Sequence, residues 1–285
     1  SKHKLDTLRT QCGADEKNLI PVWGDVTQAG LTDEATAQKL KTLKNKIGVV
    51  YHLAAVYDMG MTEEQGDQIN NEGTRNVVEF VNGLGGNVVL NHVSSVAVAG
   101  NNYVGMFREN MFDEGQEYSH PYYRTKFQSE AIVRNESTVP YRIYRPGMVV
   151  GDSVTGEMDK VDGPYYFFKT IQKIRDNVPR WLPLMGIEGG LMPIVPIDYV
   201  VNAMDALSHL EGAEYNNRAY HLLETPMPTV GSLMASMLKG AHGPEVAKNI
   251  QTDLIDQLKK AGSSAQNISL VKDLSSKAAQ QLSKK

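Results

Sequence analysis

Two short apolar runs, Gly48-Val-Val-Tyr-His-Leu53 and Asn87-Val-Val-Leu-Asn-His-Val93, flank a helical pattern over residues 67–82. Each run is too short for a stable helix and rich in β-branched residues, so both are predicted strands. The intervening segment has an apolar stripe made of Ile69, Val77, Phe80 and Val81. A strand, an amphipathic helix and a second strand in this order predict a parallel βαβ unit.

The same alternation extends in both directions. Leu19–Trp23 is an expected strand, Thr32–Asn45 an expected helix with Thr32 as its N-cap, Tyr122–Asn135 a further helix, and Tyr141–Tyr144 a further strand. After residue 145, prolines interrupt short elements, as in a small domain that covers a substrate. The predicted fold is α/β, a Rossmann-like doubly wound parallel sheet with a smaller, mostly helical C-terminal substrate domain. We expect residues 1–150, rejoined by about 191–222, in the sheet domain, and 151–190 with 223–285 in the smaller part.

Composition narrows the function classes. The 285 residues suffice for roughly two domains. The 29 Lys+Arg and 33 Asp+Glu give a net charge of −4, which argues against nucleic acid or an anionic membrane as partner. Cys12 is the only cysteine, so an intrachain disulfide framework is excluded and a reducing, cytoplasmic location is expected. No apolar run reaches the ~18 residues of a transmembrane segment, and the seven histidines show no zinc-hydrolase spacing, so no metal is expected.

The strongest chemical signal is Ser95 followed 27 residues later by Tyr122-Tyr-Arg-Thr-Lys126. Positions i and i+4 share one helix face, so Tyr122 and Lys126 are expected to face one cleft. An ammonium group beside a phenol favours the phenolate and lowers the phenol pKa, which makes Tyr122 a candidate general acid. Ser95 could orient a substrate carbonyl. Tyr123 is a weaker candidate because its i+4 partner, Phe127, cannot change the pKa of a phenol. The alternative interpretation of Tyr122 and Lys126 is chance, because a Tyr four residues before a Lys is common.

With this spacing, further stretches make the chain resemble the extended short-chain dehydrogenase/reductases: Val50–Ala55, Asn70-Asn-Glu-Gly-Thr74, Ser94-Ser95 and Arg145-Pro-Gly-Met-Val-Val-Gly151. The chain is most similar to bacterial fatty acyl-CoA and fatty aldehyde reductases, specifically to the N-terminal reductase half of two-domain forms. That likeness covers roughly residues 1–240 and is carried by His52–Gly60, His120–Lys126 and Gly156–Phe168. It implies NADPH as cofactor, with NADH as the alternative, a long-chain acyl-CoA or aldehyde as substrate, and a second reductase domain in a longer chain.

The resemblance also implies roles for individual residues. Catalysis falls to Ser95, Tyr122 and Lys126. Cofactor contacts are implied at Asp25, Val26, Leu53, Ala54, Ala55, Asn70, Ser94, Tyr122, Lys126, Pro146, Gly147 and Met148. Structural alternatives remain open: a turn cap for Asp25, tight packing for Leu53–Ala55, a helix N-cap for Asp198, and satisfied structural roles for His52 and His92.

A pocket for a long apolar tail is a further prediction. Its residues would be Met158, Tyr165, Tyr166, Phe168 and Trp181. Consecutive aromatic residues cannot all face the inside of one helix, so some must line a cleft, a partner surface or solvent. The core of an ordinary small domain is an equally good interpretation of any one of them.

One departure from the family pattern is clear. The family opens with a strand, a G-x-x-G-x-x-G turn and a helix that hold the pyrophosphate. This sequence has no such segment, and we expect it to start after the missing strand–helix–strand, with Ser1–Arg9 as the second helix. Two other functions stay open: an epimerase or dehydratase of nucleotide sugars, and a non-catalytic scaffold. The second is encouraged by the basic tail after Pro226, which carries eight Lys and four Asp+Glu, although a solvated helical face is the simpler interpretation of that tail.

Overall fold

The computed structural model describes residues 2–57, 60–101, 103–158, 163–182 and 184–250. The chain divides into two compact units. Unit 1 consists of Ser1–Val154 and Val195–Leu223, and unit 2 of Thr155–Ile194 and Glu224–Lys285. Among the described residues, no helix combines the length and the apolar character needed to cross a bilayer.

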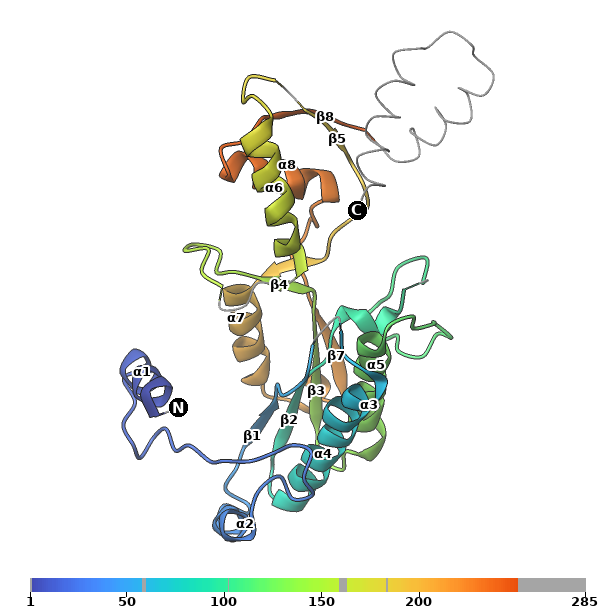
Figure 1. Cartoon of the computed structure of the whole chain (residues 1–285). Helices are drawn as coiled ribbons and strands as arrows, with labels where there is room; N and C mark the ends of the chain where they lie inside the picture. Colours follow the sequence, from blue (N-terminus) through green and yellow to red (C-terminus); the bar gives the residue numbers. More distant parts are fainter. Residues whose placement is uncertain (1, 58–59, 102, 159–162, 183, 251–285) are drawn as a thin grey trace. The chain divides into compact units, whose positions relative to one another are not determined.

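Unit 1 is built on a four-stranded sheet in the order β1-β2-β3-β7 (Figure 1). The strands are β1 (Val49–His52), β2 (Val89–Val93), β3 (Tyr141–Pro146) and β7 (Arg218–Leu222). All three pairings are parallel, so every carboxyl end lies at the same edge of the sheet. In open parallel sheets that edge is where ligands bind.

Helices cover both faces of this sheet, which confirms the predicted doubly wound α/β fold (Figure 1). On one face, α4 (Gly73–Leu84) and α5 (Pro121–Glu136) bury an aliphatic core against the strands. On the other, α7 (Ile197–Ser208) packs Val200 and Met204 near Tyr144 of β3. Consecutive side chains of β3 therefore point to opposite faces of the sheet: Ile143 packs in the first core and Tyr144 in the second.

The helical segment after β1 starts earlier than expected and changes its winding. It opens with α3 (Glu63–Gly66), whose N-terminus is closed by a capping box between Thr62 and Gln65. A six-residue π-helix, η1 (Asp67–Glu72), follows and runs into α4. The wider winding buries both Asn70 and Asn71, and π-helical turns of this kind often occur at functional sites.

At the N-terminus, the predicted strand and the predicted N-cap Thr32 are wrong. Leu19–Trp23 forms no strand, and the side chains of Ile20, Val22 and Trp23 are exposed, since no strand of the described chain pairs with them. The helix expected over residues 32–45 is the shorter α2 (Glu34–Lys41). Its N-cap is Asp33, because the Asp33 carboxylate accepts from the backbone N–H of Thr36 at 2.8 Å. A helix does form at the start, as α1 (Lys2–Cys12).

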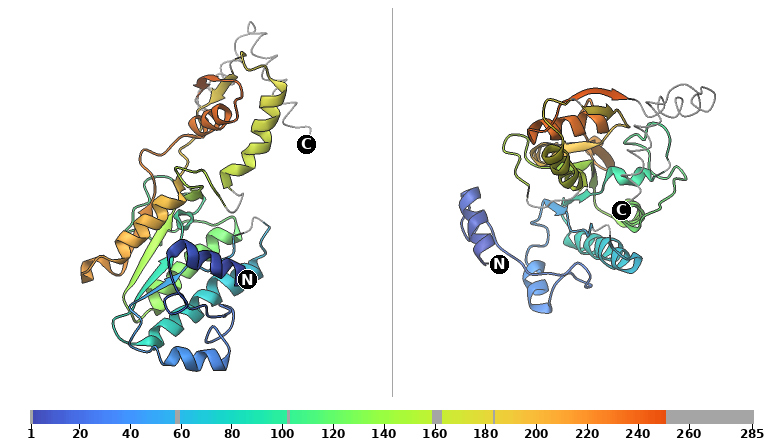
Figure 2. Two further views of the ribbon diagram at one scale, coloured as in Figure 1. Left: turned by 90° about the vertical axis from the view of Figure 1, so that its left-hand side faces the viewer. Right: turned by 45° about the horizontal axis from the view of Figure 1, so that its top comes forward.

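Unit 2 contains η3 (Gly163–Phe167), α6 (Phe168–Asn177), β5 (Leu184–Ile187), α8 (Val230–Gly240) and β8 (Val246–Ile250). β5 and β8 pair in parallel, and α6 packs against α8 (Figure 2). The remaining short elements are η2 (Val96–Ala99), β4 (Met148–Val150), β6 (Ile194–Pro196), which pairs with β4, and η4 (Ala213–Tyr215). The prediction of a solvated helical tail falls mostly on residues 251–285, outside the described residues.

Candidate active site

Ser95 lies just beyond the carboxyl end of β2 and caps the short helix η2. Its Oγ accepts a hydrogen bond from the backbone N–H of Ala97 at 3.1 Å, and the residue is 9% exposed. Within the described part of the chain, the Ser95 hydroxyl hydrogen has no acceptor. The hydroxyl can therefore donate a hydrogen bond to a carbonyl oxygen that enters the site.

The position of Tyr122 follows from how α5 begins. His120 is the N-cap, and its Nδ1 accepts from the backbone N–H of Tyr122 at 3.1 Å. Pro121 takes the first helical position, where its missing N–H costs nothing. The Tyr122 ring meets Tyr57 edge-on, with 4.6 Å between centroids. Sequence reasoning missed His120 and Tyr57, although a proline directly before the tyrosine was a signal for the cap.

Lys126 joins α5 to the end of β2. It is buried, and its Nζ donates to the carbonyl oxygen of Val93 at 3.0 Å, two residues before Ser95. The structure therefore brings the Tyr122–Lys126 turn and Ser95 to the same end of the sheet, where α5 packs on η2. An ammonium group carries three N–H donors, and among the described residues the other two have no acceptor.

Burial changes the acid–base properties around Lys126. Desolvation lowers the pKa of Lys126 from 10.5 to about 8, although the nearby Glu130 carboxylate acts in the opposite direction. Burial also lowers the pKa of His52 to about 4 and that of His92 well below its usual value. Both imidazoles are therefore neutral at physiological pH, and the proton of this group of bases sits on Lys126.

The two histidines differ in how they are held. His52 Nε2 lies 3.0 Å from Thr74 Oγ1, and that hydroxyl donates its own hydrogen to Asn70 O at 2.6 Å. His52 is thus the donor and is held as a structural histidine. The His92 ring contacts the His52 ring in a tilted arrangement, with 5.2 Å between ring centroids, but neither His92 ring nitrogen has a hydrogen-bond partner in the described chain. The expectation of a satisfied histidine is wrong for His92.

A buried charge cluster under the site was not foreseen. The Glu130 carboxylate is fully buried and accepts from the Ser94 hydroxyl at 2.7 Å, from Arg145 Nη2 at 2.6 Å and Nε at 3.1 Å, and from Arg134 Nε at 2.9 Å. A sequence signal existed, because the polar residues of α5 recur every four positions on one face: Tyr122, Lys126, Glu130 and Arg134.

Two of the predicted cofactor contacts, Ser94 and Asn70, use their side chains in hydrogen bonds within the protein. The Ser94 hydroxyl is committed to Glu130. The Asn70 amide is also fully used: its Oδ1 accepts from Val56 N at 2.8 Å, and its Nδ2 donates to Val56 O and to Thr125 Oγ1, both at 3.1 Å. Asn70 thereby ties the loop after β1 to α5, one residue before Lys126.

Asp25 and Val26, two of the predicted cofactor contacts, lie in unit 1 near the start of α4. Asp25 is exposed, and its Oδ1 accepts from the backbone N–H of Thr27 at 2.9 Å and from the Thr27 hydroxyl at 2.8 Å, which lowers the pKa of Asp25. The turn-cap interpretation of Asp25 is confirmed. Val26 packs against Gly73, where an added Cβ would lie 3.1 Å from Val26 Cγ2. This close approach explains the glycine.

The other predicted cofactor residues lie at strand ends. Leu53, Ala54 and Ala55 follow β1 and are all exposed, so tight packing does not explain them. Pro146 ends β3 and Met148 begins β4, while the Gly147 N–H donates to Leu222 O at 3.2 Å. These residues lie at the ligand-binding edge of the sheet.

Asp198 is not the N-cap of α7. The N-cap is Pro196, which has no side-chain hydrogen bond there. Asp198 instead accepts from the backbone N–H of Ser153 at 2.9 Å and from the Ser153 hydroxyl at 2.7 Å. Its carboxylate therefore fixes the loop after β4.

The residues of the predicted tail pocket belong to unit 2. Tyr165 contacts Phe168 edge-on with 5.1 Å between ring centroids, and Met158 is partly buried. Tyr166, Phe168 and Trp181 are exposed. The tail pocket stays a prediction.

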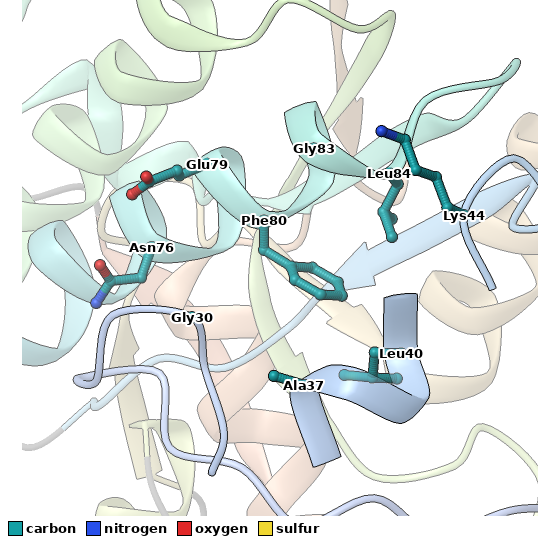
Figure 3. A pocket seen from close by; sticks show the side chains of 9 residues that line it. All are labelled: Gly30, Ala37, Leu40, Lys44, Asn76, Glu79, Phe80, Gly83 and Leu84. Atoms are coloured by element: carbon teal, nitrogen blue, oxygen red, sulfur yellow. The ribbon is translucent and has the colours of Figure 1, made fainter. Parts of the chain in front are cut away.

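A cavity of about 290 Å³ lies elsewhere in unit 1, between α2 and α4 (Figure 3). Ala37 and Leu40 of α2 face Phe80 of α4 across it. The cavity lies toward the C-terminal end of α4, where the Asn45 N–H donates to Leu84 O just before β1 begins. It is thus at the end of the sheet opposite Ser95 and contains none of the predicted site residues.

Replacing Lys126 by methionine is expected to raise the free energy of unfolding by about 2 kcal/mol near pH 7. The lowered pKa corresponds to a cost of about 3 kcal/mol for burying the ammonium group, and losing the bond to Val93 offsets about 1 kcal/mol. The folded pKa lies below the unfolded value, so the folded state binds fewer protons between pH 8 and 10.5, and the cost disappears as pH rises through that range.

Urea denaturation of wild type and Lys126→Met across this pH range would measure the effect, and the difference between the two should shrink as pH rises. The exposed Lys46→Met is the matched control and should stay within about 0.5 kcal/mol of wild type. A less stable Lys126→Met with no pH-dependent difference would contradict the assigned burial cost.

Comparison with known proteins decides the family. Residues 2–204, well over half of the chain, match the family described as Male sterility protein. The chain belongs to this family. A Drosophila melanogaster protein named for fatty acyl-CoA reductase activity is 30% identical to it over 217 residues, and an aldehyde reductase of Aspergillus flavus is 27% identical over 198 residues. Each match covers 65% of this male sterility family member, which spans 40% of the first relative and 18% of the second.

Solved structures support the fold of this male sterility family member. The terminal R domain from the myxalamid PKS-NRPS biosynthetic pathway superposes with a TM-score of 0.68 at 24% identity, over 95% of this chain and 66% of that one. A UDP-glucuronic acid 4-epimerase from Bacillus cereus in complex with NAD gives a TM-score of 0.59 at 20% identity, over 87% and 75%. With the family match, these findings confirm an extended short-chain dehydrogenase/reductase with an NAD(P)-binding fold.

Proposed function

We propose that this chain is an NADPH-dependent reductase of a fatty acyl thioester or a long-chain aldehyde. The observation that carries the proposal is the buried Lys126, which lies one helical turn from Tyr122. Its Nζ donates a hydrogen bond to the carbonyl oxygen of Val93, two residues before Ser95. The names of the fatty acyl-CoA reductase and aldehyde reductase relatives support this substrate class. A second reductase domain in a longer protein and a cytoplasmic location are part of the same proposal.

The residues at the carboxyl edge of the sheet fit a dinucleotide. Lys126 has two buried N–H donors without an acceptor in the described chain, which suits them to ribose hydroxyls. The exposed small residues Ala54 and Ala55 let a ligand approach the backbone closely. Pro146 and Met148 would border the nicotinamide, and Asp25 the adenine. When bound, the cofactor supplies a hydride to the carbonyl carbon.

The chain's own groups then handle the oxygen and the proton. Ser95 donates a hydrogen bond to the carbonyl oxygen and holds it in place. Tyr122 donates its phenolic proton to that oxygen as negative charge develops. The Lys126 ammonium stabilises the phenolate left behind. With a thioester, the resulting hemithioacetal expels the thiol, and an aldehyde and a free thiol are the products.

A nucleotide-sugar epimerase is the second candidate, favoured by the fold match to UDP-glucuronic acid 4-epimerase. At 20% identity that match concerns the fold alone. The aromatic cluster of unit 2 argues against a sugar site, because sugar pockets use mainly polar and charged groups. Tyr166, Phe168 and Trp181 expose large apolar surfaces instead.

The test is an absorbance assay of NADPH oxidation with palmitoyl-CoA, hexadecanal or UDP-glucuronic acid offered separately. We expect oxidation with one or both fatty substrates, none with the nucleotide sugar, and a lower rate with NADH. Conversion of the sugar without net NADPH consumption would instead establish the epimerase. A scaffold would give no heat in a calorimetric titration with NADPH.

A further inference from the structure

A segment we call the strap, residues 103–119, lies in the chain between Ser95 and the Tyr122–Lys126 turn of α5. It follows η2, the helix that Ser95 caps, and ends at His120, the N-cap that sets Tyr122. At its C-terminal end, the Tyr118 hydroxyl and Gln116 Nε2 donate to Val98 O at 2.9 and 2.7 Å. The position of the strap is therefore linked to both the Ser95 hydroxyl and the Tyr122 phenol.

The middle of the strap is docked on the ends of β3 and β7 by separate contacts. Arg145 Nη2 donates to Met111 O at 2.9 Å, and the Arg145 guanidinium lies over the Phe107 ring, 5.3 Å from its centroid. Glu109 Oε1 accepts from the backbone N–H of His221 at 2.7 Å. Phe107 also stacks on the His221 ring, with 6.5 Å between centroids.

Arg145 connects the docked strap to α5, the helix that carries Tyr122 and Lys126. The same fully buried guanidinium pairs with Glu130 of α5, and Glu130 holds the hydroxyl of Ser94 beside Ser95. Arg145 Nη1 also lies 3.3 Å from His221 Nε2. Since arginine can only donate, His221 Nε2 is the acceptor and its proton is on Nδ1. One connected cluster, centred on Arg145 of β3, thus links α5, the end of β2, β7 and the strap.

Glu109 differs from the rest of this cluster because it is exposed. β7 is the last strand in the order of the sheet, so no further strand of the described chain accepts from its outer backbone N–H groups. At His221, the Glu109 carboxylate accepts the outward-facing backbone N–H that a neighbouring strand would otherwise accept. A hydrogen bond to a charged acceptor is stronger than one to a neutral group. Removing an exposed carboxylate has little effect on the stability of the fold, whereas it removes the hydrogen bond by which Glu109 holds the strap to β7.

We propose that Glu109 is a positioning residue that, by docking the strap on β7, sets the separation of the Ser95 hydroxyl and the Tyr122 phenol. This inference rests on the proposed reductase function, because the two groups act there on one carbonyl oxygen. Misplacement of such groups by a fraction of an ångström slows the chemical step without weakening cofactor binding.

The experiment compares Glu109→Ala, Glu109→Gln and Glu114→Ala with wild type. We expect Glu109→Ala to lower kcat about tenfold, with KM for NADPH and thermal stability unchanged, and to speed amide hydrogen exchange at His221 about tenfold. Glu109→Gln should retain most activity because its amide oxygen accepts the same N–H. Glu114 is exposed on the same strap, and no contact of its side chain with β7 is seen, so Glu114→Ala should match wild type.

An unchanged kcat in Glu109→Ala, or an equal loss in Glu109→Gln, would overturn the proposal, as would unaltered exchange at His221. If the wild-type chain reduces none of the fatty substrates, the proposed function fails. The exchange comparison then still decides whether Glu109 docks the strap, so the two failures are distinguishable.

Discussion

Replacing Tyr122 by phenylalanine is expected to lower kcat about a thousandfold while leaving the affinity for NADPH within about twofold. The substitution removes only the phenolic hydroxyl, which is the proposed proton donor. The phenylalanine ring can keep the edge-on contact with Tyr57 and the same place on α5. Steady-state NADPH oxidation with palmitoyl-CoA gives kcat, and calorimetric titration with NADPH gives the affinity.

Tyr123→Phe is the matched control for this prediction. It removes the same hydroxyl from the adjacent residue of α5, whose i+4 partner is Phe127 and not a lysine. We expect its kcat to stay within about twofold of wild type. Equal losses in the two variants, or a Tyr122→Phe enzyme with more than a tenth of the wild-type kcat, would remove Tyr122 from its role.

Truncating Glu130 to alanine is expected to lower the free energy of unfolding by about 4 kcal/mol, because it leaves the fully buried Arg145 guanidinium without its carboxylate. Urea denaturation measures the loss. The double variant Glu130→Leu, Arg145→Met should recover much of it, since an apolar pair of similar size carries no unpaired charge. The double variant also keeps the prediction testable if Glu130→Ala does not fold.

Glu136→Ala provides the surface comparison. Glu136 is on the same helix as Glu130, α5, and pairs with Arg75 of α4 at 3.2 Å, but both side chains are about 40% exposed. Solvent screens such pairs, and the expected loss is below about 1 kcal/mol. A similar small loss for Glu130→Ala would show that the buried cluster does not hold the site together.

The sequence predicted the sheet where the pattern is local and failed where pairing is not. The β-branched runs at β1 and β2 were enough to predict both strands, because apolar runs of that length suit a buried parallel strand. Leu19–Trp23 has the same character but forms no strand, since a strand also needs a neighbour and composition does not supply one. The π-helical winding at Asp67–Glu72 depends on where the Asn70 amide finds partners in Val56 and Thr125, which no local rule contains.

The site was predicted where helix geometry alone decides the outcome. The i, i+4 rule placed Tyr122 and Lys126 together. Sequence spacing did not show that the Ser94 side chain donates to buried Glu130 or that the Asn70 side chain donates to buried Thr125. Glu130 and Arg145 were missed because charged residues are rarely fully buried, and only the fold shows that these two meet.

Label transfer tests the central claim most directly. NADPH carrying deuterium at both C4 positions would be incubated with palmitoyl-CoA and the wild-type chain, and the products analysed by mass spectrometry. The proposed function predicts hexadecanal with deuterium at its carbonyl carbon, together with free coenzyme A and oxidised cofactor in equal amounts. Thioester cleavage without label in the product, or without cofactor oxidation, would contradict it.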